Sequence, residues 1–120
     1  MAKLNQKVFK KEKDAILTFA STELDLGLKE LKPFEVDGAK EKHVPVIENK
    51  NDLVKISVGE VAHPMQDVHY IEWISIETTK GFQIKYLNPG DEPVACFALT
   101  KDEKLVNAYA YCNLHGLWKA

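Results

Sequence analysis

The sequence predicts an all-β protein, a sandwich or a barrel built from short strands. From residue 44 onward, apolar and polar side chains alternate with a period of two, as they do along a strand with one buried face. Clusters of glycine, proline, asparagine and aspartate separate these stretches, and none of them carries the longer period of an amphipathic helix. Short strands between frequent turns are typical of such all-β folds.

The expected strands follow one another at short intervals. The clearest is 53–58, because its apolar residues Val54, Ile56 and Val58 share one face. The other expected strands are 44–47, 70–76, 82–86, 94–99 and 105–111. Turns are expected at 48–52, 79–81, 88–93 and 100–103.

The N-terminal third is less regular. Residues 1–22 are rich in lysine and mixed in character, and they predict no particular element. In 23–37, leucines at every second position from Leu24 favour a strand, although Gly27 weakens the pattern and Pro33 ends it.

Composition narrows the class of protein. With 120 residues, 45% hydrophobic and 28% charged, the chain suits one domain, or one domain and a short appendage. A net charge of −2 indicates neither nucleic acid nor a membrane surface as partner, and no apolar run approaches the roughly 20 residues of a membrane helix.

Without a visible signal peptide, we expect a cytoplasmic protein. Two cysteines are too few for a secreted disulfide scaffold, and Cys96, in an apolar run, is expected to be a buried thiol.

The strong metal ligands gather in three places, each beside an expected strand end or turn. They are His43, the pair His63 and His69, and the pair Cys112 and His115; the chain has no other histidine. Each fragment alone has an ordinary interpretation, such as a hydrogen-bonded histidine or a chance Cys-x-x-His. Taken together, the five residues indicate a metal site on loops at the edge of a sheet.

The number of ligands favours iron. Four imidazoles and one thiolate exceed the four ligands of structural zinc, and blue copper would leave two histidines unused. A thiolate opposite an open position also pushes electron density onto the metal, which favours reduction of an oxygen species there.

Three motifs, in order, resemble those of the superoxide reductases, the neelaredoxin and desulfoferrodoxin family. The first is Ala39-Lys40-Glu41-Lys42-His43-Val44-Pro45-Val46-Ile47-Glu48. The second is His63-Pro64-Met65 with His69-Tyr70-Ile71, and the third is Cys112-Asn113-Leu114-His115-Gly116-Leu117-Trp118.

The resemblance implies a fold, a reaction and a set of roles. The fold is a seven-stranded immunoglobulin-like β-sandwich, and the reaction is the one-electron reduction of superoxide to hydrogen peroxide. One iron per chain would be held by His43, His63, His69 and His115 in a plane, with Cys112 as axial thiolate. Glu41 would occupy the sixth position in the oxidised state, and Lys42 would attract superoxide and help to protonate the product. The implied electron donor is rubredoxin or a similar small redox protein, and the implied assembly is a homodimer or homotetramer.

The resemblance also divides the chain. Residues 38–120 correspond to the catalytic domain. Residues 1–37 are interpreted as a metal-free relic of a desulforedoxin-like domain, because no cysteine precedes Cys96 to form its four-cysteine iron centre.

Two alternatives stay open, and three residues near the expected ligands are also interpreted. The chain could be a non-catalytic metal-binding or electron-transfer module with a closed sixth position, or a cysteine-nucleophile enzyme with Cys112 as nucleophile and His115 as base. Trp118 and Tyr111 are interpreted as core packing in preference to shielding of the site. Asn113 is a candidate for orienting the thiolate through backbone hydrogen bonds.

Overall fold

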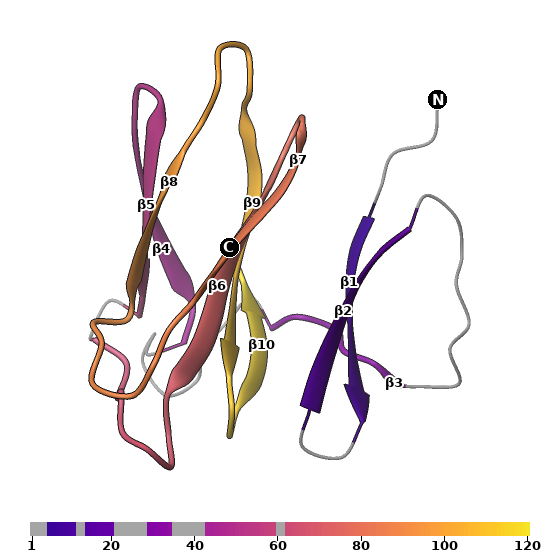
Figure 1. Cartoon of the computed structure of the whole chain (residues 1–120), viewed down its shortest axis with the longest axis vertical. Helices are drawn as coiled ribbons and strands as arrows, with labels where there is room; N and C mark the ends of the chain where they lie inside the picture. The colour runs from indigo at the N-terminus through magenta and orange to yellow at the C-terminus, as the bar shows by residue number, and fades with distance from the viewer. Residues whose placement is uncertain (1–4, 12–13, 21–28, 35–42, 60–61) are drawn as a thin grey trace. The chain divides into compact units, whose positions relative to one another are not determined.

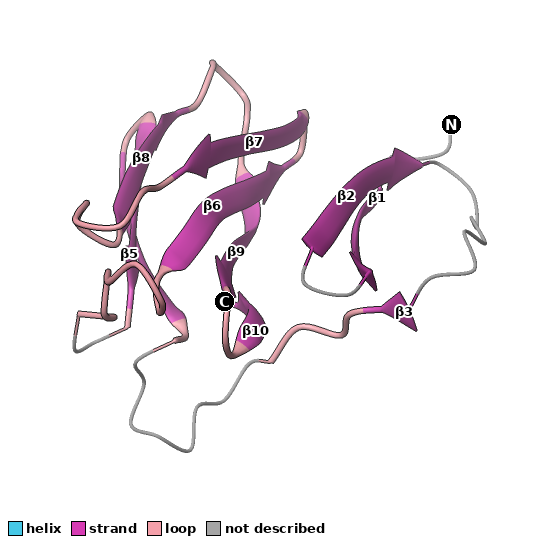
Figure 2. Cartoon of the chain, turned by 60° about the horizontal axis from the view of Figure 1, so that its bottom comes forward, coloured by secondary structure: helices cyan, strands magenta, loops and turns pink. Residues whose placement is uncertain are grey.

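The computed structural model describes residues 5–11, 14–20, 29–34, 43–59 and 62–120. All the regular elements in this part of the chain are β-strands (Figure 2). None of these residues belongs to a helix long and apolar enough to cross a membrane. The chain divides into two compact units, Met1–Lys32 and Pro33–Ala120.

The first unit is a small antiparallel sheet with the strand order β2-β1-β3. Its strands are β1 (Asn5–Lys11), β2 (Asp14–Ala20) and β3 (Lys29–Glu30). The backbone N–H of Leu31 donates to the carbonyl of Val8 at 2.7 Å, and Val8 is buried. The sequence pattern missed β1 and β2. Of the strand predicted within 23–37, the described residues contain β3, while 23–28 and 35–37 lie outside them.

The second unit is a two-sheet sandwich of seven strands (Figure 1). One sheet has the order β4-β5-β8, made of β4 (Pro45–Lys50), β5 (Leu53–Val58) and β8 (Val94–Ala98). The other has the order β10-β9-β6-β7, made of β6 (Ile71–Thr78), β7 (Gly81–Tyr86), β9 (Leu105–Cys112) and β10 (Gly116–Lys119). All paired strands are antiparallel. The predicted seven-stranded immunoglobulin-like sandwich is confirmed.

Alternation along the strands builds the core between the sheets. Val54, Ile56 and Val58 of β5 are fully buried, as their spacing predicted. On β8, Ala95 and Phe97 face inward, so Cys96 faces the other way and is only half-buried, contrary to the expectation of a buried thiol. The core is completed by Ile71, Ile74, Ile76, Leu99, Ala108, Ala110 and Cys112. The thiol of Cys112 therefore lies at one end of the hydrophobic core.

A β-bulge interrupts the pairing of β6 with β9 at that same end. Ile71 lies opposite Cys112 and Trp73 lies opposite Tyr111, so Glu72 is an extra residue on β6. A bulge bends its strand and re-aims the neighbouring side chains. The bulge therefore helps to set the direction in which the chain runs from His69 into the start of β6.

Candidate metal centre

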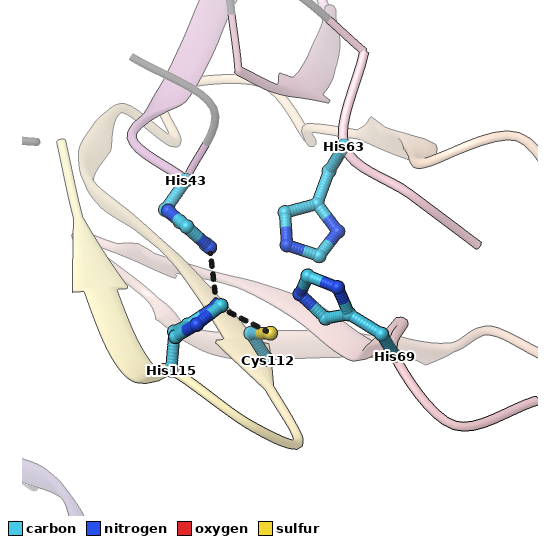
Figure 3. Close-up of side chains that lie close together, drawn as sticks. All are labelled: His43, His63, His69, Cys112 and His115. Carbon is cyan, nitrogen blue, oxygen red and sulfur yellow. Dashed lines mark hydrogen bonds between the residues drawn. The ribbon is translucent and has the colours of Figure 1, made fainter. Parts of the chain in front are cut away.

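Five residues from three separate stretches of chain meet at one end of the sandwich (Figure 3). Three of them, His43, His63 and Cys112, are buried; His69 is half-buried and His115 is exposed. Their nitrogen and sulfur ligand atoms all lie within 4.8 Å of one another. The five residues singled out from the sequence as metal ligands are therefore brought together, in a group open to solvent on the His115 side.

The four imidazole rings are arranged as a square. Neighbouring ring centroids are 4.7 Å apart for His43 and His63 and 4.8 Å apart for His63 and His69. The other two sides are 4.9 Å for His69 and His115 and 4.7 Å for His115 and His43. The His43–His69 distance is longer, 6.5 Å, as expected for a diagonal. Adjacent rings meet edge to face at 65–82°, so their nitrogens can converge on one point without the rings stacking.

The hairpin of β9 and β10 carries two of the five candidate ligands, at or beside its turn. Cys112 pairs with Gly116 across the hairpin, which leaves three residues in the turn. Gly116 has a φ of 83°, in the left-handed region that glycine adopts without strain. The tight turn brings His115 Nδ1 to 3.9 Å from Cys112 Sγ and 2.9 Å from His43 Nε2. The sequence Cys-x-x-His-Gly therefore forms a turn in which the side chains of Cys112 and His115 point towards the same place.

The loop between β5 and β6 carries the second pair of candidate ligands, His63 and His69. The backbone N–H of His63 donates to the Val58 carbonyl at 3.3 Å, which ties the start of the loop to the end of β5. Gln66 and His69 exchange two backbone hydrogen bonds, of 2.9 and 3.0 Å. Each histidine therefore lies on backbone that is held by hydrogen bonds.

His63 is prepared to bind a cation through Nε2. Its Nδ1 lies 2.7 Å from the carbonyl oxygen of Pro64, which only accepts, so Nδ1 carries the proton and donates. Nε2 is left with a lone pair, buried and without a hydrogen-bond partner. Burial lowers the pKa of His63 to about 4, so the ring is neutral near pH 7. A buried acceptor with no partner is costly in a folded protein, and a metal ion at this point would satisfy it.

Cys112 contributes the one sulfur atom of the group. Burial raises the pKa of its thiol, while the backbone amides of Leu114 and His115 lower it. These amides, and not that of Asn113, face the sulfur; the Asn113 amide donates to the Tyr70 carbonyl at 3.2 Å. The predicted backbone contribution of Asn113 to the thiolate is therefore wrong. A metal cation would displace the thiol proton and stabilise the thiolate inside the apolar core.

Trp118 touches two of the proposed ligand residues. Its indole ring stacks on His43 with centroids 4.7 Å apart and planes at 15°, and its N–H donates to the His115 carbonyl at 3.2 Å. Trp118 is buried, as the packing interpretation expected, and it also covers His43, which was the less favoured alternative; nothing in the sequence showed that β10 runs beside residue 43. Tyr111 does belong to the packing: it is buried and stacks on Trp73, with ring centroids 5.7 Å apart.

The two remaining residues of the expected site, Glu41 and Lys42, lie outside the described residues. The donor set itself, four imidazole nitrogens and one thiolate sulfur around a single point, fits one metal ion and is more than a tetrahedral ion uses. The fold and the site define a class: small β-sandwich proteins with a four-histidine, one-cysteine group at one end of the core.

Comparison with known proteins identifies the family. The desulfoferrodoxin family model matches residues 35–120, and the chain belongs to this family. It is 52% identical over 84 residues to a desulfoferrodoxin homolog of Archaeoglobus fulgidus, covering 70% of this chain and 66% of that protein. It is 50% identical over 93 residues to the desulfoferrodoxin of Nitratidesulfovibrio vulgaris, covering 78% and 72%. The chain thus spans about two thirds of the length of these relatives.

Solved structures match as well. The superoxide reductase of Treponema pallidum superposes with a TM-score of 0.79 at 38% identity, covering 98% of each chain. The superoxide reductase (1Fe-SOR) of Giardia intestinalis superposes with a TM-score of 0.59 at 39% identity, covering 68% of this chain and 96% of that one. The first match extends over both units of the chain, and the second accounts for about two thirds of it.

Proposed function

We propose that this protein is a superoxide reductase, which reduces superoxide by one electron to hydrogen peroxide at one mononuclear iron per chain. The observation that carries the proposal is the convergence of the four imidazoles and Cys112 in a chain of the desulfoferrodoxin family. Iron bound here would supply one electron and an open coordination position, and each turnover takes up two protons as peroxide forms. An external donor then restores the reduced state.

The protein's own groups prepare this chemistry. The imidazole nitrogens would hold iron, and the ring of His63 is oriented for this by Pro64. The thiolate of Cys112 would raise electron density at the metal. Trp118 covers one face of the His43 ring, which keeps that imidazole in place.

The same geometry disfavours the cysteine-nucleophile alternative. A nucleophilic cysteine needs access and a lowered pKa, whereas Cys112 is fully buried and burial raises its pKa.

Metal analysis together with the visible spectrum of the oxidised protein tests the proposed function. We expect about one iron per chain and a visible thiolate-to-iron charge-transfer band. One zinc per chain and no colour, persisting after reconstitution with iron, would contradict the proposal and leave the closed metal-binding module as the better description.

Glu41 and Lys42 have proposed roles at the open side of the iron. The Glu41 carboxylate would occupy the sixth position in the oxidised resting state and withdraw for substrate. The Lys42 ammonium would attract anionic superoxide and help to deliver a proton to the product, since a cation beside a site raises the on-rate of an anion.

Replacing Lys42 tests the attraction. In Lys42→Ile, the second-order rate constant for superoxide should fall by about tenfold at low ionic strength, and by less at high salt, because salt screens the attraction. Pulse radiolysis at two ionic strengths measures both values. The matched control is Lys80→Ile, an exposed lysine in the turn that follows β6, roughly 25 Å along the strand from Ile71. A rate that is unchanged in Lys42→Ile, or reduced equally in both variants, contradicts steering by Lys42.

We further propose that residues 1–37 form a metal-free N-terminal domain that contacts another copy of the chain in a homodimer or homotetramer. The division of contacts after Lys32 and the match of the family model from residue 35 support a boundary in this region. The donor is proposed to be rubredoxin or a similar small redox protein, and the location cytoplasmic.

Deleting residues 1–37 should shift the protein towards monomers in sedimentation velocity while the metal site remains intact. A shorter chain of similar structure is known, since 68% of this chain covers 96% of the Giardia intestinalis superoxide reductase. A truncated protein that keeps the full-length association state and stability would contradict a contact role for the N-terminal domain.

A further inference from the structure

We propose that the side-chain amide of Asn113 is a positioning group for His69, acting as an extra peptide unit that extends the β6–β9 pairing by one step. This inference rests on the proposed metal centre and adds a residue to it. The regular pairing of the two strands ends with Ile71 opposite Cys112, so the two residues before Ile71 lie beyond the last strand pair.

Hydrogen bonds from Asn113 continue the pairing past that end. Its Nδ2 donates to the Val68 carbonyl at 3.1 Å, and its Oδ1 accepts from the Tyr70 N–H at 3.0 Å. Its own backbone N–H donates to the Tyr70 carbonyl at 3.2 Å. The amide orientation follows from the partners, because the Val68 carbonyl can only accept and the Tyr70 N–H can only donate.

The two side-chain bonds bracket His69, one residue on either side. In an antiparallel pair the two opposite residues exchange both backbone bonds, and here Asn113 Oδ1 takes the place of the backbone carbonyl in the exchange with Tyr70. The Gln66–His69 exchange holds His69 from within its own turn, and Asn113 holds the same turn from the opposite loop. The loop carrying Cys112 is thereby joined to the loop carrying His69.

The role needs both a donor and an acceptor at fixed reach. An aspartate would keep the acceptor for Tyr70 but place a carboxylate oxygen against the Val68 carbonyl, where two acceptors repel. A glutamine would be one methylene too long for the 3.1 and 3.0 Å contacts. Neither residue can replace the peptide-like pair of bonds.

Cobalt(II) binding to the metal-free protein tests the inference without recourse to activity. In Asn113→Ala, we expect the dissociation constant for cobalt to rise by about 10- to 100-fold, the usual effect of losing a group that orients a ligand. We also expect the ligand-field and thiolate charge-transfer bands to change, because the His69 ring is no longer held. Asn113→Asp, which keeps the size of the side chain, should show an effect of the same sign.

Asn107→Ala is the matched control. Asn107 lies on β9, the strand that precedes Asn113. The side-chain amide of Asn107 donates to Glu77 at 2.7 Å, away from the five candidate ligands. We expect its cobalt affinity and spectrum to equal those of the unmodified protein, even if its thermal stability falls.

A double-mutant cycle separates positioning from general stability. If Asn113 acts through His69, adding Asn113→Ala to His69→Ala should weaken cobalt binding by less than twofold beyond His69→Ala alone. Equal losses in both backgrounds, or unchanged cobalt affinity and spectrum in Asn113→Ala and Asn113→Asp, would overturn the inference while leaving the proposed function standing. Failure of the unmodified protein to bind cobalt would overturn both.

Discussion

The Cys112→Ser variant should lose the thiolate-to-iron charge-transfer band and at least 100-fold of the superoxide reductase rate, roughly 2.7 kcal/mol of transition-state stabilisation. The hydroxyl of serine is a harder and far more weakly acidic ligand than a thiol, so it does not supply an anionic sulfur donor. Its oxygen would also be fully buried at the end of the hydrophobic core. The measurements are the visible spectrum of the oxidised protein and the superoxide decay after pulse radiolysis.

Cys96→Ser is the control for this variant. Cys96 is the other cysteine of the chain, half-buried on β8, and its neighbours Ala95 and Phe97 face the core instead. We expect its spectrum and rate to equal those of the unmodified protein. If Cys112→Ser kept the charge-transfer band, the sulfur ligand would have to be sought elsewhere.

The His63→Leu variant should change metal binding and stability in opposite directions. Removal of one of the four imidazoles should weaken iron or cobalt binding by more than the roughly 10- to 100-fold that loss of an orienting neighbour causes. In the metal-free protein, however, leucine removes Nε2, which is buried without a hydrogen-bond partner. Relief of such a group is worth about 1–3 kcal/mol, and loss of the Nδ1–Pro64 bond offsets part of it.

The free energy of unfolding of metal-free His63→Leu should therefore be no lower than that of the metal-free parent. Urea denaturation in the presence of a chelator measures it, and a cobalt titration measures the affinity. Gln83→Ala serves as the control, because Gln83 likewise donates to a backbone carbonyl, that of Ala98, but lies away from the centre. A His63→Leu protein that bound cobalt as tightly as the parent would remove His63 from the ligand set.

The sequence predicted the strands of the sandwich where the chain obeys a simple period. Along β5 the alternation of buried and exposed side chains is visible in the residues themselves. Along β6 it is not, because six of its eight residues are buried, and the bulge at Glu72 changes the register. β10 has only four residues, too few for a period of two to be recognised. The lysines of β1 interrupt the alternation of apolar and polar residues that would have predicted a strand.

The five residues that converge at the candidate metal centre could be singled out because the chain holds so few residues of the right chemistry. What surrounds them could not be read in the same way. Asn113 makes its side-chain bonds to residues 43 to 45 positions earlier in the chain. The stacking of Trp118 on His43 likewise depends on β10 lying beside a distant segment. Such contacts follow from the tertiary fold, and no local sequence pattern predicts them.

The placement of the five ligands has a consequence for the lifetime of the folded protein. His43 and His63 flank strands of the β4-β5-β8 sheet, whereas His69, Cys112 and His115 flank strands of the other sheet. An ion held by all five would fasten the two layers together at one end and close a chain segment of 72 residues between His43 and His115. At a free-metal concentration 100 times the dissociation constant, linkage adds about 2.7 kcal/mol to stability. Metal binding therefore lowers the population of opened chains that proteases can cut. In cells short of iron, this protein would be degraded faster.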